Sequence, residues 1–167
     1  MINPAFLDVL RQLYARLNGT DINWAVTGSL CFALQGVPMP EVHDIDLQSD
    51  AAGAYAIERL FVEHVTRKVK LSAASRIRSH FGALQIDGIK VEIMGDVEKR
   101  VDAASDWEEP PDLNSVKRYV QVDEMCVPVM DLEYECLAYR DMGRVAKANL
   151  LRQWLDEKKR ASQLANV

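Results

Sequence analysis

The 167-residue sequence predicts an α+β fold, in which helices pack on one face of a mixed β-sheet and leave the other face open. Three observations predict this class. An amphipathic helical pattern begins the chain, a short strand turns directly into a helix at Gly28, and an Asp-Gly pair joins two alternating segments. We expect a single domain over residues 1–167, with a core at about 20–130 and a helical tail at about 131–165.

Helices and strands alternate in the first half of the chain. Asn3 and Pro4 begin a helix whose apolar residues recur at three- and four-residue spacing, and Asn18-Gly19 ends it. Capping and breaker residues then divide the next 40 or so residues into short elements. We expect strands at 23–27 and 43–48, a helix at 29–36, and another helix that begins at Ser49 or Asp50.

The second half begins with a hairpin and ends in helices. Asp87-Gly88 suits a type I′ turn, in which both central residues have positive φ. The acidic, proline-containing stretch 105–115 is typical of a surface loop. The other expected elements are strands at 82–86, 89–94, 118–122 and 125–129, and helices at 131–142 and 144–164 on either side of Gly143.

Composition restricts the functional class. The chain has 20 basic and 25 acidic residues and a formal net charge of −5, so bulk binding to nucleic acid is not expected. The three cysteines, Cys31, Cys126 and Cys136, have no C-x-x-C spacing and apolar neighbours, which predicts buried thiols in a reducing compartment. No apolar run reaches the ~18 residues of a membrane span. We therefore expect a cytoplasmic protein without a membrane segment.

Two aspartates on one predicted strand are the strongest indication of chemistry. Alternation places Asp44 and Asp46 on one face and Ile45 and Leu47 on the other. Residues two apart on a strand lie roughly 7 Å apart, which lets two carboxylates converge on a metal. The same alternation in the hairpin places Glu92 on the open face, so three acids could meet there.

The Gly28-Ser29 turn adds a second feature. A strand that ends in small residues before a helix offers free backbone N–H groups to an anion. Taken alone, this turn is more often an ordinary connection, and a lone D-x-D is more often a half-exposed strand. Their combination is much more specific. His43 precedes the aspartates, but alternation places it on the core side, which favours a structural role.

These residues resemble the signature of the nucleotidyltransferase superfamily typified by DNA polymerase β. The matching segments are VTGS (Val26–Ser29), DIDL (Asp44–Leu47) and KVEIM (Lys90–Met94). The step from Gly28 to Asp44 is similar to that of short bacterial and archaeal members, including lincosamide-type enzymes. The tail PVMDLEYECLAYRDMGRVAKANLLRQWL also resembles their helical C-terminus. Altogether the resemblance covers most of residues 20–155 and implies a nucleotidyltransferase fold.

The resemblance implies transfer of a nucleoside monophosphate from a nucleoside triphosphate to a small-molecule or protein acceptor, with Mg²⁺ or Mn²⁺ as cofactor. Pyrophosphate would leave after in-line attack on the α-phosphate. Glu92 would complete the metal site or accept the proton of the acceptor. The implied metal ligands and catalytic residues are Asp44, Asp46 and Glu92, and the implied nucleotide contacts are Gly28, Ser29, Arg76, Arg78 and Arg140, although a solvated role is at least equally open for each arginine.

Three positions differ from the family pattern, and all three bear on contacts to the substrates rather than on the metal ligands. The segment before Asp44 lacks the arginine or threonine of many relatives. Arg140 stands near a usual lysine, and Lys147-Ala148 stands where Lys-Asp is common.

Two other functions stay open at the sequence level. One is a binding module of the same fold, such as an antitoxin-like partner of a small helical toxin; the other is a metal-dependent phosphohydrolase, which would have no need of the Gly-Ser turn. The apolar residues Leu150, Leu151 and Trp154 could serve either internal packing or a homodimer.

Overall fold

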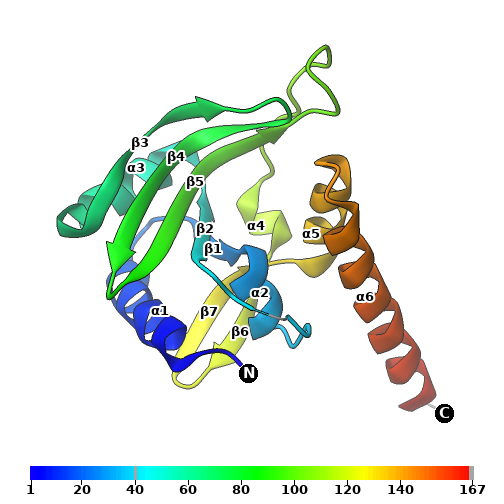
Figure 1. Cartoon of the computed structure of the whole chain (residues 1–167). Coiled ribbons are helices and arrows are strands. Elements are labelled where there is room, and N and C mark those ends of the chain that lie inside the picture. The colour runs from blue at the N-terminus through cyan, green and yellow to red at the C-terminus, as the bar shows by residue number, and fades with distance from the viewer. Residues whose placement is uncertain (40, 166–167) are drawn as a thin grey trace.

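A seven-stranded mixed β-sheet organises the fold, as the computed structural model shows for residues 1–39 and 41–165 (Figure 1). The strand order is β3-β4-β5-β2-β1-β7-β6. The strands are β1 (Trp24–Thr27), β2 (Ile45–Ser49), β3 (Val65–Ala73), β4 (Ile77–Ile86), β5 (Ile89–Lys99), β6 (Lys117–Val122) and β7 (Met125–Met130). The helices are α1 (Pro4–Leu17), α2 (Gly28–Leu34), α3 (Ala51–Leu60), the 3₁₀ turn η1 (Val62–His64), α4 (Leu113–Val116), α5 (Leu132–Asp141) and α6 (Val145–Ala165).

The central strand β2 determines which side chains meet. It pairs antiparallel with β1 and parallel with β5. Thr27 and Glu92 are therefore the two cross-strand partners of Asp46. On either side the sheet continues through antiparallel pairs, β3-β4-β5 and β6-β7, and β7 joins β1 in parallel. The register places the end of β1 and the middle of β5 beside the D-x-D strand.

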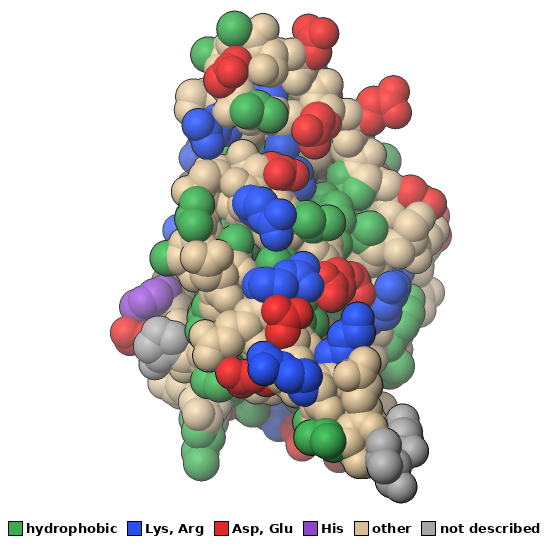
Figure 2. All heavy atoms as spheres, turned by 90° about the vertical axis from the view of Figure 1, so that its right-hand side faces the viewer, with side chains coloured by type: hydrophobic (Ala, Val, Ile, Leu, Met, Phe, Trp, Pro, Cys, Tyr) green, Lys and Arg blue, Asp and Glu red, His purple; other side chains and the backbone are tan. Residues whose placement is uncertain are grey.

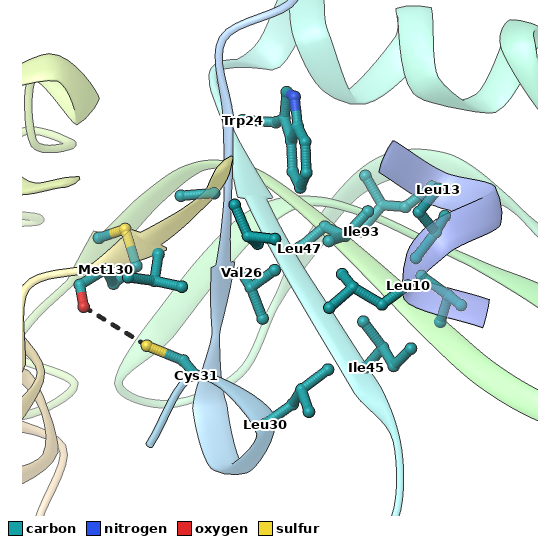
Figure 3. Close-up of a cluster of buried hydrophobic side chains, with 14 of the residues drawn as sticks. Leu10, Leu13, Trp24, Val26, Leu30, Cys31, Ile45, Leu47, Ile93 and Met130 are labelled. Atoms are coloured by element: carbon teal, nitrogen blue, oxygen red, sulfur yellow. Dashed lines mark hydrogen bonds between the residues drawn. The ribbon is translucent and has the colours of Figure 1, made fainter. Parts of the chain in front are cut away.

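Helices cover the apolar face, and Figure 1 shows α1 and α3 against it while α5 and α6 stand on the other side of the molecule. Asn3 caps α1 by accepting a hydrogen bond from Ala5 N at 3.0 Å. Leu10 and Leu13 of this helix are fully buried. Figure 3 shows Leu10 near Ile45 from β2 and Leu13 near Ile93 from β5. Burial of this kind contributes roughly 1.5–3 kcal/mol for each large aliphatic side chain.

The sequence-based elements are largely confirmed, including the α+β class. The helix at 4–17, the Asp-Gly hairpin and the two C-terminal helices around Gly143 all form. Asp87 and Gly88 have φ values of 48° and 80°, as a type I′ turn requires. The hairpin strands are longer than predicted, since β4 begins at Ile77 and β5 continues to Lys99.

Several elements differ from the sequence-based expectation. Arg67, Lys68 and Lys70 lie in the edge strand β3, which the sequence analysis missed because its exposed residues hide the alternation. The predicted loop at 105–115 ends in the short helix α4, where Leu113 enters the core. Cys126 is exposed rather than buried, because it points outward from β7 between the buried Met125 and Val127.

His43 was placed on the wrong side by the sequence analysis. Strand β2 begins only at Ile45, so the alternation that assigned His43 to the core does not extend to it. Its side chain is 73% exposed and lies 3.7 Å from the Glu41 carboxylate. In α6, Leu151 is buried in the core, Trp154 packs against the core and Leu150 is exposed. Within the described residues, the helices are too short or too polar to cross a membrane.

Candidate active site

Three carboxylates converge on the open face of the sheet. Asp44 immediately precedes β2, Asp46 lies within it, and Glu92 is the cross-strand partner of Asp46 on β5. Each offers an oxygen, and these oxygens lie within 4.8 Å of one another. The alternation proposed from the sequence therefore does bring the three acids together. Ile45 and Leu47 point into the core and fix the orientation of the strand.

The carboxylates repel one another in a partly desolvated site. Burial, followed by the charges of Asp44 and Glu92, raises the pKa of Asp46 from 3.8 to about 7. Near neutral pH the Asp46 carboxyl is therefore protonated in part of the molecules. A cation would remove the repulsion and favour the fully ionised set.

The donor chemistry fits a divalent metal. Mg²⁺ and Mn²⁺ prefer hard oxygen ligands, and carboxylates supply them with compensating charge. The raised pKa of Asp46 and the convergence of three acidic oxygens are the observations that support this fit. Asp44, Asp46 and Glu92 are therefore the residues that would hold a metal.

The turn between β1 and α2 lies directly against this carboxylate set. Gly28 has φ +69°, a conformation that glycine adopts readily and other residues rarely do. A Cβ added at Gly28 would overlap Asp46 Oδ2. Glycine is thus required at this position for two reasons, which are the backbone conformation and the close approach of Asp46. Ser29 follows it and lines the same cavity.

A buried glutamate supports the turn between β1 and α2. Glu135 on α5 is only 4% exposed, and its carboxylate accepts a hydrogen bond from the Thr27 hydroxyl. Burial raises the pKa of Glu135, while the hydrogen bonds from the Thr27 hydroxyl and the Gly28 backbone N–H lower it. The sequence analysis missed this residue, because a glutamate on an amphipathic helix carries no motif of its own. Glu135 connects the C-terminal helices to the Gly28 turn.

A cavity of about 630 Å³ joins these parts. The carboxylates and the Gly28-Ser29 turn form one wall, and α5 with the beginning of α6 forms another. Three basic side chains also line it, namely Lys99, Arg144 and Lys147. Figure 2 shows that Lys and Arg side chains gather along the face of the molecule that carries α5 and α6, with acidic side chains among them.

The cationic residues of the cavity differ in burial. Lys99 is buried, and its ammonium donates to the Tyr134 hydroxyl at 2.9 Å. Arg144 and Lys147 are exposed at the rim, and both lie over the Tyr139 ring, at 5.8 Å and 5.4 Å from its centroid. The sequence analysis included Arg144 and Lys147 in the tail that resembles the family, but it did not propose Lys99, Arg144 or Lys147 as nucleotide contacts. Gly143, with φ 75°, lies between α5 and α6 next to Arg144, and the Gly-Arg-x-x-Lys pattern in the tail is the signal that could have selected Arg144 and Lys147.

The three arginines proposed from the sequence lie outside the set that lines this cavity among the described residues. Arg78 makes a two-pronged contact with Glu98, at 2.6 Å and 2.9 Å, and lies over the Trp107 ring. Arg76 is exposed and close to the α5–α6 turn, where a Cβ on Gly143 would lie 2.7 Å from its Nη1. Arg140 is exposed on α5. Of the predicted nucleotide contacts, Gly28 and Ser29 line the cavity.

The comparisons with known proteins agree with this fold and cavity. A crystal structure of a candidate nucleotidyltransferase from Thermotoga maritima is 58% identical, with a TM-score of 0.82 over 94% of this chain and 96% of that chain. The fold is therefore that of a nucleotidyltransferase. Residues 9–154 match the aminoglycoside-2''-adenylyltransferase family, and the chain belongs to that family.

A more distant structure shows the same fold. It is ANT(2'')-Ia in complex with adenylyl-2''-tobramycin, with 11% identity and a TM-score of 0.60 over 93% of this chain and 92% of that chain. A search of curated proteins found no match.

The position of Gly28 gives a first prediction. We expect Gly28→Ala to weaken Mn²⁺ binding at least several-fold and to lower stability, because the new methyl displaces the Asp46 carboxylate. Gly19→Ala is the matched control, since Gly19 has φ +81° and a Cβ there would meet nothing within 4 Å. Both variants carry the backbone strain of roughly 1 kcal/mol. Paramagnetic titration of Mn²⁺ measures the affinity, and equal binding by both variants would contradict the proposed contact.

The raised pKa of Asp46 gives a second prediction. The folded protein binds more protons than the unfolded chain between about pH 4 and pH 7, so the stability contributed by the Asp46 proton is present at low pH and lost as the pH rises through 7. Asp46→Asn removes this dependence. In chelator, its stability relative to wild type should increase from pH 5 to pH 8, by at most a few kcal/mol at ~1.4 kcal/mol per pKa unit.

Urea denaturation at the two pH values measures this difference. Asp106→Asn, in an exposed part of the 105–115 stretch, controls for the general loss of one carboxylate. The same Asp46→Asn difference at both pH values would show that the carboxylates do not interact as described. An unfolded Asp46→Asn variant would mean that the aspartate is structural.

Proposed function

We propose that this protein is a metal-dependent nucleotidyltransferase that moves a nucleoside monophosphate from a nucleoside triphosphate to a hydroxyl-bearing acceptor. The observation that carries the proposal is the convergence of Asp44, Asp46 and Glu92 beside the Gly28-Ser29 turn in one cavity. Carboxylates at this separation suit divalent metals, and the adjoining turn offers donors to phosphate oxygens. Membership of a nucleotidyltransferase family supports the same reaction class.

The carboxylates have assigned roles in this proposal. Asp44 and Asp46 hold the divalent cation, and Glu92 either completes the ligand set or accepts the proton of the acceptor hydroxyl. When bound, Mg²⁺ or Mn²⁺ supplies positive charge to the phosphate oxygens as negative charge develops on them. Asp46, whose carboxyl is protonated in part near neutral pH in the metal-free protein, must lose that proton to become a ligand.

Phosphate contacts come from two sides of the cavity. Gly28 allows the triphosphate to approach the backbone closely, and the Ser29 hydroxyl and N–H donate to its oxygens. Lys99, Arg144 and Lys147, which also line the cavity, offer the cations that a polyphosphate requires. We therefore propose these three residues as phosphate contacts, in place of the arginines suggested by the sequence, which do not line the cavity among the described residues. Arg76 stands close enough to the α5–α6 turn to add charge at the rim.

The proposed chemical step is a displacement at phosphorus. The acceptor oxygen forms a bond to the α-phosphorus, and the bond from that phosphorus to the bridging α–β oxygen breaks. Pyrophosphate leaves with the electron pair, and the hydroxyl proton passes to a carboxylate or to solvent. The residues of this chain bind, orient and neutralise the reactants.

The acceptor is proposed only as a class, a hydroxyl on a small molecule or on a protein side chain. The ANT(2'')-Ia structure contains an adenylylated aminoglycoside, which illustrates one such acceptor in a distant relative.

Calorimetry of nucleotide binding tests the proposal. ATP, GTP, CTP and UTP are titrated with and without Mg²⁺ into wild type and Asp46→Asn. We expect metal-dependent binding of at least one triphosphate to wild type and its loss in the variant, because the variant removes a charged ligand. If the folded wild-type protein bound no triphosphate, the result would instead favour a binding module whose function depends on a protein partner.

The basic residues of the cavity give a further prediction. Arg144→Ala should weaken metal-dependent triphosphate binding about five- to ten-fold, as expected for loss of one charge-assisted contact. Arg140→Ala is the matched control, because Arg140 is exposed four residues away and is not among the described residues that line the cavity. Isothermal titration compares the two variants, and equal affinities would remove Arg144 from the phosphate site.

A further inference from the structure

A lysine lies against the carboxylates that are proposed to bind metal. Lys90 stands two residues before Glu92 on β5, so both side chains leave the same face of the strand. Its ammonium contacts the Glu92 carboxylate and lies 3.8 Å from Asp44 Oδ2. Like other lysines, Lys90 is charged near neutral pH. One ammonium therefore contacts two of the three converging acids.

This ammonium and a metal ion would compete for two of the same carboxylates. A bound Mg²⁺ places its ligand oxygens at about 2.0–2.1 Å and carries twice the charge of the ammonium. Two cations at one small carboxylate set repel each other. Lys90 is 49% exposed and has a flexible four-carbon stem, so its ammonium can move into water without disturbing the sheet.

We propose that Lys90 is an internal counter-ion of the carboxylate set, which holds Asp44 and Glu92 before a metal binds and is displaced when it does. This inference rests on the metal site of the proposed function. It implies that Lys90 stabilises the metal-free protein and lowers the affinity of the carboxylates for a metal. Lys90 is thus a positioning residue that keeps like charges together in an open cavity until the metal arrives.

Mn²⁺ binding without nucleotide tests the proposal on the full chain. Lys90→Met keeps the length of the stem and removes the charge, and it should bind Mn²⁺ roughly ten-fold more tightly than wild type, as removal of one nearby positive charge predicts. Lys90→Gln should shift the affinity in the same direction, and Lys90→Arg should retain wild-type affinity. Lys70→Met removes an exposed charge from β3 and should leave the affinity within about two-fold.

Unfolding of the metal-free protein provides a second readout. In chelator, Lys90→Met should unfold at a lower temperature than wild type, and saturating Mn²⁺ should reduce or reverse this difference, because the metal replaces the lost charge. If wild type binds no Mn²⁺, the proposed function fails together with this inference. If wild type binds Mn²⁺ and neither Lys90→Met nor Lys90→Gln binds it more tightly, only the role of Lys90 is overturned.

Discussion

Electrostatic repulsion among three carboxylates is the constraint on which the site depends. The backbone places Asp44, Asp46 and Glu92 on one face of the sheet, because Ile45 and Leu47 are committed to the core and the β2–β5 register sets Glu92 opposite Asp46. Their oxygens lie within 4.8 Å of one another, and burial, followed by the charges of Asp44 and Glu92, raises the pKa of Asp46 to about 7. The hydrophobic core thus holds in place a charge arrangement that is unfavourable without a cation, and this is the physical basis for proposing a metal site.

The surroundings of the carboxylates extend the same electrostatic pattern. Glu135 is buried beneath the Gly28 turn and ties α5 to β1 through the Thr27 hydroxyl, so the C-terminal helices and the sheet are positioned together. Lys99, Arg144 and Lys147 line the same cavity as the carboxylates. Acidic and basic side chains in one cavity suit a ligand that combines a divalent cation with a polyphosphate, since each part meets its opposite charge. A protein that bound only an apolar partner would have no need of this arrangement.

The sequence predicted most of the fold, because periodicity and turn residues report directly on local structure. The Asp-Gly turn, the helix caps and the D-x-D alternation all act over a few residues, and they located the three acids and Gly28 correctly in space. Features that depend on distant packing were missed. The basic edge strand β3 has little alternation. Arg78 forms an ion pair with Glu98 from the neighbouring strand. Lys99 reaches the cavity only because β5 extends past its predicted end. The buried Glu135 was missed for a similar reason, because no local pattern shows that α5 packs over the Gly28 turn.

Anomalous diffraction would test the metal site most directly. Crystals of the protein grown with Mn²⁺ and a non-hydrolysable nucleoside triphosphate would show the ion by its anomalous scattering. The account predicts a peak within coordinating reach of the Asp44, Asp46 and Glu92 oxygens, with the triphosphate passing beside Gly28 and Ser29. A well-ordered nucleotide elsewhere on the protein, or a Mn²⁺ peak away from these carboxylates, would contradict the central claim that their convergence builds a nucleotidyltransferase site.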